Sequence, residues 1–291
     1  MAAFTIKSSF KLNSGYELPL LGFGIYQTPP AETERIVALA FAAGYRHIDS
    51  AAAYQNEAGA GAAIRKSSIP RSEIFFTSKV PSSAISYKGA AEQVDRTLRE
   101  SGLDYIDLML LHAPFGGSEN RKGAWRALVE AVEAGKVRSI GVSNYGVHHL
   151  DELAQHIKEL EEERGGPGKG GVLSVGQWEI HPWLARSDIV AWCAKHNVAV
   201  EAYSPLVRGE RWGEAVLAAL AKKHGVTEAQ VLVRWSLQKG HIPLPKSVTP
   251  SRIEANANVY GFSLTDAEVA ELETKEYKPV CWDPTVSPLN E

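Results

Sequence analysis

Short apolar runs alternate with helix-like stretches along almost the whole chain of 291 residues. Near-continuous apolar runs are typical of parallel strands that are covered on both faces. We expect such strands at residues 20–26, in a run ending at residue 48, and at 74–79, 105–111, 135–142, 173–179, 198–203 and 241–245. We expect helices between them at about residues 30–43, 56–66, 88–101, 121–134 and 147–163. This alternation predicts an α/β fold, a (β/α)8 TIM barrel, as a single domain over residues 1–291.

Several segments add to this pattern. Residues 4–20 alternate loosely around Asn13-Ser14-Gly15 and predict an N-terminal β-hairpin that covers the amino end of the barrel. The glycine-rich residues 165–171 predict a flexible loop within the domain. Capping-box spacing predicts helices that begin after Thr227 and Thr265, the second of them in a C-terminal tail. Thr28 is expected to cap the first helix.

The bulk properties favour small ligands over large charged partners. The formal net charge is -3, which gives no electrostatic reason to expect nucleic acid or an anionic membrane. The chain has no apolar run of 18 residues, and residues 1–7 lack the apolar core of a signal peptide, so we expect a cytoplasmic protein. Cys193 and Cys281 form no zinc or redox motif and are expected to be free thiols, and we expect no bound metal.

Four ionisable side chains follow successive strands. The stretch GYRHIDSAAAYQNE, residues 44–57, places Asp49 and Tyr54 one short loop apart, and Lys79 and His112 end two later strand-like runs. Catalytic groups of barrel enzymes lie at the carboxyl ends of the strands. The alternative is that each is an ordinary loop residue, such as an acid that caps a turn or a phenol at the rim. Their occurrence together favours an active site.

These four residues match the pattern of Asp, Tyr, Lys and His in the aldo-keto reductase family, which the chain resembles. The segment at residues 44–57 is similar to the family's signature, and the resemblance extends from LLGFG at 20–24 to Trp282-Asp283-Pro284. It implies an NADP-dependent enzyme, an alcohol:NADP oxidoreductase similar to the fungal NADPH-dependent members. Such an enzyme reduces aldehydes or ketones to alcohols.

The chemistry of carbonyl reduction requires groups of these kinds. Hydride transfer to a carbonyl carbon builds negative charge on its oxygen, which needs a proton donor and polar groups directed at it. Tyr54 could donate that proton, although an unperturbed phenol has a pKa of about 10. We expect Lys79 to lower this pKa and Asp49 to keep Lys79 charged and oriented. A neutral His112 could donate a hydrogen bond to the carbonyl oxygen and orient the substrate.

No side chain can supply a hydride, so a cofactor must, and the resemblance implies NADPH. Gly22-Phe23-Gly24 is not a G-x-G-x-x-G turn because the third glycine is missing. Candidate cofactor residues instead follow strands five to eight. By resemblance, Ser143, Asn144 and Gln177 would hold the carboxamide, Tyr203 the nicotinamide ring, Ser204 and Leu206 the pyrophosphate, Lys246, Ser247 and Arg252 the 2′-phosphate, and Asn256 the adenine.

The substrate wall departs from relatives that line it with tryptophans. At the matching positions this chain has Tyr26, Pro81 and Ala113. Trp212 and Trp282 could supply other aromatic walls. A wider pocket leaves apolar surface unfilled by slim molecules, so bulkier cyclic, branched or sugar-like carbonyls are the expected substrates.

Two further departures concern the cofactor. Gly176 stands where many relatives have asparagine, and Ala255 stands where a glutamate often reaches the adenine, so both weaken peripheral contacts. We expect a monomer that acts on a small-molecule carbonyl. One alternative is a regulatory, channel-subunit type of protein that holds the cofactor as a sensor, and another is a different reaction on the same barrel. The complete set of four residues disfavours an inactive scaffold.

Overall fold

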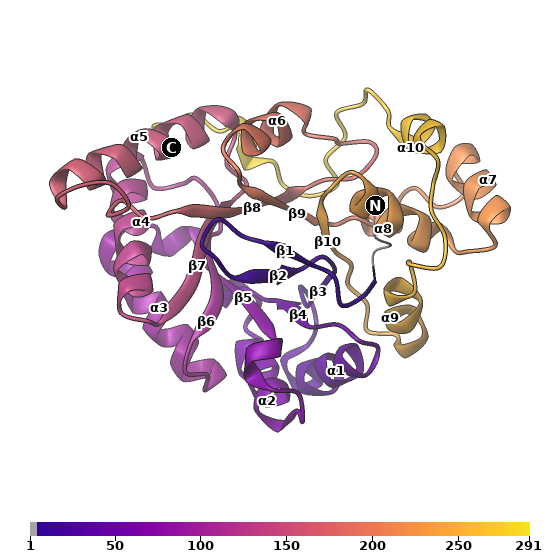
Figure 1. The fold of residues 1–291 in the computed structure, drawn as a ribbon, viewed down its shortest axis with the longest axis horizontal. Coiled ribbons are helices and arrows are strands. Elements are labelled where there is room, and N and C mark those ends of the chain that lie inside the picture. The colour runs from indigo at the N-terminus through magenta and orange to yellow at the C-terminus, as the bar shows by residue number, and fades with distance from the viewer. Residues whose placement is uncertain (1–4) are drawn as a thin grey trace.

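The structure is a computed structural model that describes residues 5–291, and its core is a ring of parallel strands (Figure 1). Each strand pairs with the next in chain order, which gives an eight-stranded sheet among these residues. The strands are β3 (Gly22–Gly24), β4 (His47–Asp49), β5 (Phe75–Val80), β6 (Ile106–Leu111), β7 (Val137–Ser143), β8 (Leu173–Glu179), β9 (Ala199–Tyr203) and β10 (Ile242–Leu244). The predicted (β/α)8 barrel is confirmed.

The barrel closes between its first and last strands. The amide of Gly24 donates a hydrogen bond to the carbonyl oxygen of Pro245 at 3.1 Å. Glycine allows this approach, because a Cβ on Gly22 would collide with the side chains of Leu244 and His47. β3 is shorter than the expected 20–26, since the amide of Leu20 bonds instead to Ser8 in the hairpin.

Helices surround the strands on the outside of the barrel (Figure 1). They are α1 (Pro30–Ala42), α2 (Glu57–Lys66), α3 (Tyr87–Ser101), α4 (Ser118–Glu133), α5 (Val147–Glu163), α6 (Ser187–Lys195), α7 (Ala215–His224), α8 (Glu228–Gln238), α9 (Pro250–Ala257) and α10 (Asp266–Leu272). Both predicted capping boxes are present, at Thr227 and Thr265. The predicted cap at Thr28 is wrong, because Pro29 occupies the N-cap position of α1.

The N-terminal hairpin closes one end of the barrel. It consists of β1 (Ser9–Lys11) and β2 (Glu17–Pro19), while Phe4 of the predicted segment lies outside the described residues. Leu12 and Leu18 are buried against side chains from the strands, including Phe75 and Val175. An apolar plug therefore fills the amino end, and the carboxyl end is left for a site.

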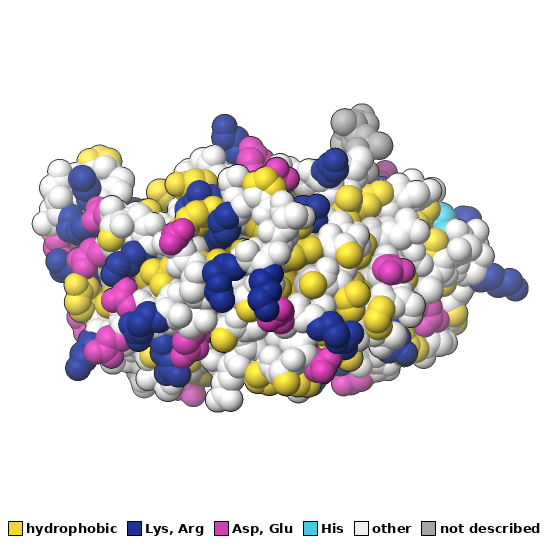
Figure 2. Space-filling model, turned by 90° about the horizontal axis from the view of Figure 1, so that it is seen from below, with side chains coloured by type: hydrophobic (Ala, Val, Ile, Leu, Met, Phe, Trp, Pro, Cys, Tyr) yellow, Lys and Arg dark blue, Asp and Glu magenta, His cyan; other side chains and the backbone are white. Residues whose placement is uncertain are grey.

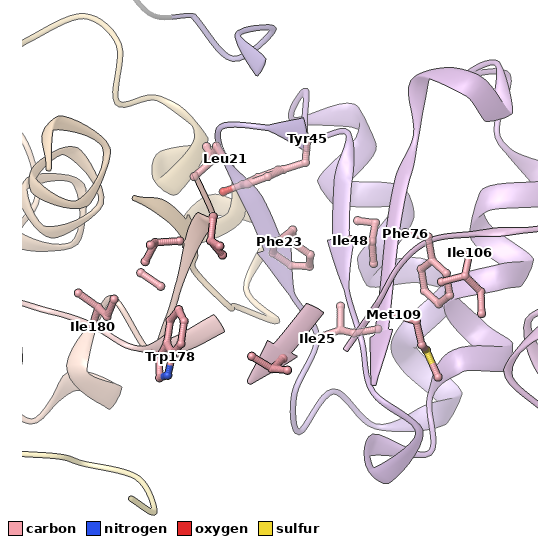
Figure 3. Packing of buried hydrophobic residues seen from close by; sticks show 14 of the residues in the cluster. Leu21, Phe23, Ile25, Tyr45, Ile48, Phe76, Ile106, Met109, Trp178 and Ile180 are labelled. Atoms are coloured by element: carbon pink, nitrogen blue, oxygen red, sulfur yellow. The ribbon is translucent and has the colours of Figure 1, made fainter. Parts of the chain in front are cut away.

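Side chains point alternately inward and outward along each strand, so they pack in two separate hydrophobic clusters. Outward side chains such as Phe23, Ile48 and Phe76 lie in a row on neighbouring strands and pack in the larger cluster that includes the helices (Figure 3). The inward or outward direction of every other side chain on these strands is then known, because residues two apart share a face. Since Phe75 points inward to the plug, Lys79 on the same strand also points into the barrel.

The outer surface and the loops complete the architecture. On the face in Figure 2, basic and acidic side chains are interspersed among hydrophobic and uncharged ones. The glycine-rich segment at 165–171 is a loop after α5, and Trp125 donates a hydrogen bond to its Gly170 carbonyl at 2.8 Å. In residues 5–291, no helix is both long enough and apolar enough to cross a membrane.

Candidate active site

Asp49 and Lys79 form a buried ion pair at the carboxyl end of the barrel. Asp49 ends β4 and Lys79 lies one residue before the end of β5, so the pairing of these strands brings the side chains together. Lys79 Nζ is 2.8 Å from each carboxylate oxygen of Asp49 and 2.7 Å from the carbonyl oxygen of Ser50. All three donors of the ammonium group are thereby used, which fixes the position of this fully buried side chain.

Tyr54 lies over this pair, on the 3-10 turn η1 (Ala52–Tyr54) that follows β4. The Lys79 Nζ atom is 5.2 Å from the centre of the Tyr54 ring. Burial, followed by the negative charge of Asp49, raises the pKa of Tyr54 well above its ordinary value. The expected lowering of this pKa by Lys79 is therefore wrong for the protein alone, since Asp49 neutralises the ammonium charge. Tyr54 is a neutral phenol.

His112 faces Tyr54 from the end of β6. The two rings meet edge to face with centroids 5.8 Å apart, and Trp282 meets the other side of His112 at 6.1 Å. Burial and then the charge of Lys79 lower the pKa of His112 to about 3. The imidazole is consequently neutral near pH 7 and can donate one hydrogen bond.

A hydrogen-bonded group continues around the barrel rim. Asn144 Nδ2 donates to the carbonyl oxygen of His112 at 2.9 Å, and its Oδ1 accepts from the Tyr203 hydroxyl at 2.8 Å. Ser143 Oγ donates to the backbone of Gln177 at 2.9 Å. Asn144 adopts a left-handed conformation with φ of 62°, which asparagine tolerates better than most residues. These contacts hold the ends of β6 to β9 in one arrangement.

A cavity of about 1020 Å³ opens above these residues. Three of the four predicted catalytic residues line it, namely Asp49, Tyr54 and His112, while Lys79 is buried behind them. Of the predicted cofactor residues, those on the lining are Ser143, Asn144, Gln177, Tyr203, Ser204, Leu206 and Lys246. The structure thus brings predicted catalytic and cofactor residues that are up to 197 positions apart (49 to 246) together in one cavity.

The remaining predicted cofactor residues follow Lys246 outside this lining. Ser247 is buried, and its Oγ accepts a hydrogen bond from the amide of Thr249 at 3.1 Å. Arg252 is exposed on α9, and Asn256 is buried on the same helix. Of these predicted cofactor residues that follow β10, only Lys246 lines the cavity, and Arg252 lies exposed six residues further along the chain.

The predicted substrate residues divide into two groups. Tyr26 and Trp282 line the cavity, and the Tyr26 and Tyr54 rings are 5.0 Å apart. Pro81, Ala113 and Trp212 are not on its lining within residues 5–291. Ala113 is fully buried, and Trp212 is 47% exposed. A larger side chain at position 113 would consequently disturb the packing of the core more directly than the size of the pocket.

Several lining residues were not predicted. They are Gly24, Gln27, Ala53, Ser82, Ser83, Pro205, Arg208, Leu244 and Cys281. Ser82 and Ser83 follow the end of β5, so the rule that selected Lys79 could have selected them as well. Cys281 has no such local signal, because it lies in the tail and approaches Ser204 at 3.3 Å.

The tail after α10 reaches the cavity and is anchored on both sides of Trp282. Glu179, at the end of β8, accepts hydrogen bonds from the amides of residues 280 and 281 at 2.6 and 3.0 Å. Arg186 donates to the carboxylate of Asp283 at 2.8 Å. Glu179 and Arg186 are both buried, so this tail clasp, formed by Glu179 and Arg186, fixes the aromatic wall.

Metal chemistry has no visible basis among the described residues. Within residues 5–291, no group of three or more His, Cys, Asp or Glu side chains is arranged to hold a metal ion. The groups that line the cavity include phenols, amides, hydroxyls, one neutral imidazole, the Asp49 carboxylate, and the side chains of Arg208, Lys246 and Cys281. This set suits binding and proton transfer.

Comparison with known proteins agrees with this geometry. The sequence model described as the Aldo/keto reductase family matches residues 20–276. An uncharacterized oxidoreductase of Schizosaccharomyces pombe is 39% identical over 97% of this chain and 99% of its own length. Glyoxal reductase of Bacillus subtilis is 37% identical over 92% of this chain and 93% of its own length. The crystal structure of an aldo-keto reductase from a deep-sea metagenome library is 35% identical, covers 97% of this chain and 100% of its own, and superposes with a TM-score of 0.86.

The range matched by the family model contains the four ionisable side chains at the strand ends, and the matched crystal structure covers nearly the whole chain. The relatives named as reductases and oxidoreductases place the chain among carbonyl-reducing enzymes. The chain belongs to the aldo/keto reductase family.

Proposed function

We propose that the protein is an NADPH-dependent reductase that converts aldehydes or ketones to alcohols, with Tyr54 as the proton donor. The observation that supports this most strongly is the Lys79–Asp49 pair beneath a neutral Tyr54, with a neutral His112 opposite on the same cavity. NADPH would supply the hydride. The residues of the chain bind and orient the reactants and move the proton.

Proton transfer is assigned to the phenol because of its protonation state. Tyr54 keeps its proton at neutral pH, since burial and Asp49 raise its pKa. As negative charge develops on the carbonyl oxygen, the Tyr54 hydroxyl donates its proton to that oxygen. The ion pair of Lys79 with Asp49 lies beneath the ring, and its ammonium nitrogen, 5.2 Å from the ring centre, is the cation beside the phenolate that this transfer leaves.

Substrate orientation is assigned to His112. Its ring is held between Tyr54 and Trp282, and its low pKa leaves a neutral imidazole with one N–H. That N–H can donate to the carbonyl oxygen without the desolvation penalty of a buried charge. Two donors would then define where the oxygen lies, which fixes the face that the hydride reaches.

The residues present fit a nicotinamide dinucleotide. Gln177, Ser143 and Asn144 supply amide and hydroxyl groups next to the ring face of Tyr203, as a carboxamide and a flat heterocycle require. Ser204 and Leu206 would follow the pyrophosphate. Lys246 on the lining, with Ser247, Arg252 and Asn256 beyond it, would hold the 2′-phosphate and the adenine.

For the substrate we propose bulkier carbonyl compounds, including cyclic or sugar-like ones. The cavity of about 1020 Å³ would hold the nicotinamide end of the cofactor together with the substrate, so its volume alone does not define the substrate, and the residues at its mouth support this class instead. Tyr26 and Trp282 provide aromatic walls at its mouth, while Ser82 and Ser83 add hydroxyl groups that could bind a polyhydroxylated molecule. A sensor role with little turnover is less well supported, because the proposed catalytic groups are complete.

An assay of NADPH oxidation with a panel of carbonyl compounds tests the proposed function. The panel would contain short straight-chain aldehydes, branched and cyclic ketones, and open-chain sugars, each with NADPH and with NADH. We expect turnover with NADPH, and higher kcat/KM for the bulky compounds. Tight NADPH binding without turnover on any compound would instead favour the sensor role, and absence of NADPH binding would reject the proposed function.

A further inference from the structure

A second carboxyl group lies inside the barrel, below the proposed catalytic residues. Glu201 is on β9, where Ala199 and Tyr203 share its inward face because residues two apart alternate together. Its side chain is completely buried. A buried carboxyl is unfavourable unless its oxygens accept hydrogen bonds, and in Glu201 it is Oε2 that does so, while Oε1 has no hydrogen-bond partner among the described residues. The Oε2 contact therefore indicates what the side chain holds.

Gln177 connects Glu201 with the ion pair. The Nε2 atom of Gln177 donates to Asp49 Oδ2 at 2.8 Å and to Glu201 Oε2 at 2.7 Å. A primary amide has two N–H groups, and both are now used inside the barrel. Gln177 also lines the cavity, so its remaining polar atom, Oε1, is the acceptor that it can present there.

We propose that Glu201 is a positioning residue, which orients the Gln177 amide so that its oxygen faces the cofactor while its nitrogen supports Asp49. The inference rests on the proposed function, because Gln177 is a proposed contact of the nicotinamide carboxamide. Asp49 alone would accept only one of the two hydrogens. Reversal of the amide would break its hydrogen bonds to both Asp49 and Glu201, and it would direct the amide oxygen at the ionised carboxylate of Asp49.

The charges around Glu201 determine its protonation. From β4 it faces Asp49 and His47, whose Nε2 is 3.6 Å from Glu201 Oε1 and also contacts Thr77 at 3.0 Å. From β5 it faces the Lys79 ammonium, while β10 pairs the uncharged Ile242 with it.

Burial and then Asp49 raise the pKa of Glu201 to about 8, against the Gln177 hydrogen bond and Lys79, which lower it. Burial and then Lys79 lower the pKa of His47 to about 3, so His47 is neutral. At pH 7 Glu201 is therefore mostly protonated and accepts from Gln177 through one oxygen. Above pH 8 it becomes a second carboxylate that competes with Asp49 for the Gln177 amide.

Two substitutions distinguish the role of the Glu201 acceptor oxygen from the role of its ionisation. Glu201→Gln retains an acceptor oxygen but cannot ionise, while Glu201→Met keeps the approximate length without an acceptor. We expect Glu201→Met to weaken NADPH binding about ten-fold, from the usual contribution of one hydrogen bond, and to lower kcat. Glu201→Gln should restore both values at pH 7. In the wild type, NADPH affinity should change near pH 8, and this change should be missing in Glu201→Gln.

A matched control excludes general loss of stability. Val200→Ala lies on the same strand but faces outward, so it should lower stability to urea while leaving NADPH affinity and kcat unchanged. Coupling is tested with Gln177→Met, because Glu201→Met should add little to a chain in which Gln177 is already replaced.

The outcomes are distinguishable. Wild-type NADPH affinity and kcat in a folded Glu201→Met variant would overturn the inference, as would a pH-dependent change that persists in Glu201→Gln. If Glu201→Met fails to fold, the pH comparison of wild type with Glu201→Gln still decides the question. If the wild type itself neither binds NADPH nor reduces carbonyls, the proposed function fails instead.

Discussion

At the scale of single residues, burial sets the protonation of the site. The two groups proposed to face the carbonyl oxygen, Tyr54 and His112, are shifted in opposite directions, yet both shifts leave the group neutral. Lys79 and Asp49 carry the charge, and they neutralise each other at 2.8 Å. The groups proposed to face the carbonyl oxygen are therefore donors for a developing oxyanion that carry no charge of their own.

A few residues on and near α9 should determine whether NADPH or NADH is preferred. NADPH should be preferred over NADH because Lys246 and Arg252 meet a 2′-phosphate only in NADPH. Exposed charge-assisted hydrogen bonds, after discounting for solvent, suggest a preference of about ten- to a hundred-fold in kcat/KM. Arg252→Ala should reduce that preference mainly through the KM for NADPH, as steady-state kinetics with both cofactors would show.

Arg35→Ala provides the control for Arg252→Ala. Arg35 is an exposed arginine that pairs with Glu32 on α1 at 2.7 Å, so its loss should leave the cofactor preference unchanged. An Arg252→Ala variant with the full wild-type ratio of NADPH to NADH efficiency would show that the 2′-phosphate is bound elsewhere.

Single residues also show where sequence reasoning succeeds and fails. Asp49, Tyr54, Lys79 and His112 could be found because each lies at or shortly after the carboxyl end of a strand, a position with a known meaning in barrels. Glu201 could not be found in this way, because nothing in the local sequence distinguishes an inward-facing functional residue in the middle of a strand from an ordinary core residue. Gly176 was taken as a lost polar contact, yet a Cβ there would collide with the Trp178 ring, which no local pattern shows.

At the scale of elements, strand–helix alternation was predictable and contacts between distant segments were not. The helix at 147–163 was expected with its observed bounds, since its sequence pattern is strong. No bounds were predicted for α6, whose N-cap Arg186 is left-handed and has no capping side-chain bond. The tail clasp joins Arg186 to Asp283 over 97 positions, a pairing that only the fold creates.

The tail clasp should control substrate binding more than cofactor binding. Arg186→Met removes the buried partner of Asp283 and frees the segment that carries Trp282. We expect the KM for bulky carbonyls to rise roughly ten-fold, from the loss of a charge-assisted hydrogen bond, with a smaller change in the Kd for NADPH. Steady-state kinetics and tryptophan fluorescence would measure the two effects.

Arg96→Met is the comparison for Arg186→Met, because Arg96 is an exposed arginine paired with Glu100 on α3. It should leave both KM and Kd unchanged. Equal losses of substrate and cofactor binding in Arg186→Met would mean that the clasp supports the whole cavity and not its aromatic wall.

At the scale of the whole molecule, a plugged amino end and an open carboxyl end leave many polar groups inside the barrel. Three histidines are buried as well, on β4, on α5 and just before β10: His47, with its pKa lowered to about 3, and His149 and His241, with pKa values of about 4. Burial is the largest cause of each shift. All three are neutral in the native protein at pH 7.

These histidines should make the fold sensitive to acid. Between pH 6.5 and 5 the unfolded chain takes up protons that the native histidines exclude, so stability falls with falling pH. Each histidine lowers the free energy of unfolding by up to roughly 1.4 kcal/mol for each pH unit of this fall. Glu201 has a raised pKa, so its effect on stability has the opposite sign and offsets that of about one histidine. Urea unfolding should show a lower midpoint at pH 5 than at pH 6.5, and an equal or higher midpoint at pH 5 would contradict the assignment.

The central claim is that Tyr54 supplies the proton in a carbonyl reduction. Tyr54→Phe keeps the ring over Lys79 and removes only the hydroxyl, so NADPH binding should not change. Tyr105→Phe is the control, since the Tyr105 hydroxyl contacts the backbone of Arg71 at 3.3 Å, away from the cavity.

The decisive measurement is kcat of Tyr54→Phe on the best carbonyl substrate, with the Kd for NADPH followed by quenching of tryptophan fluorescence in the same preparation. We predict a loss of turnover on the order of 10²-fold or more with an unchanged Kd, from the usual size of acid catalysis. Near-normal turnover in Tyr54→Phe would contradict the claim and assign the proton to another group on the cavity.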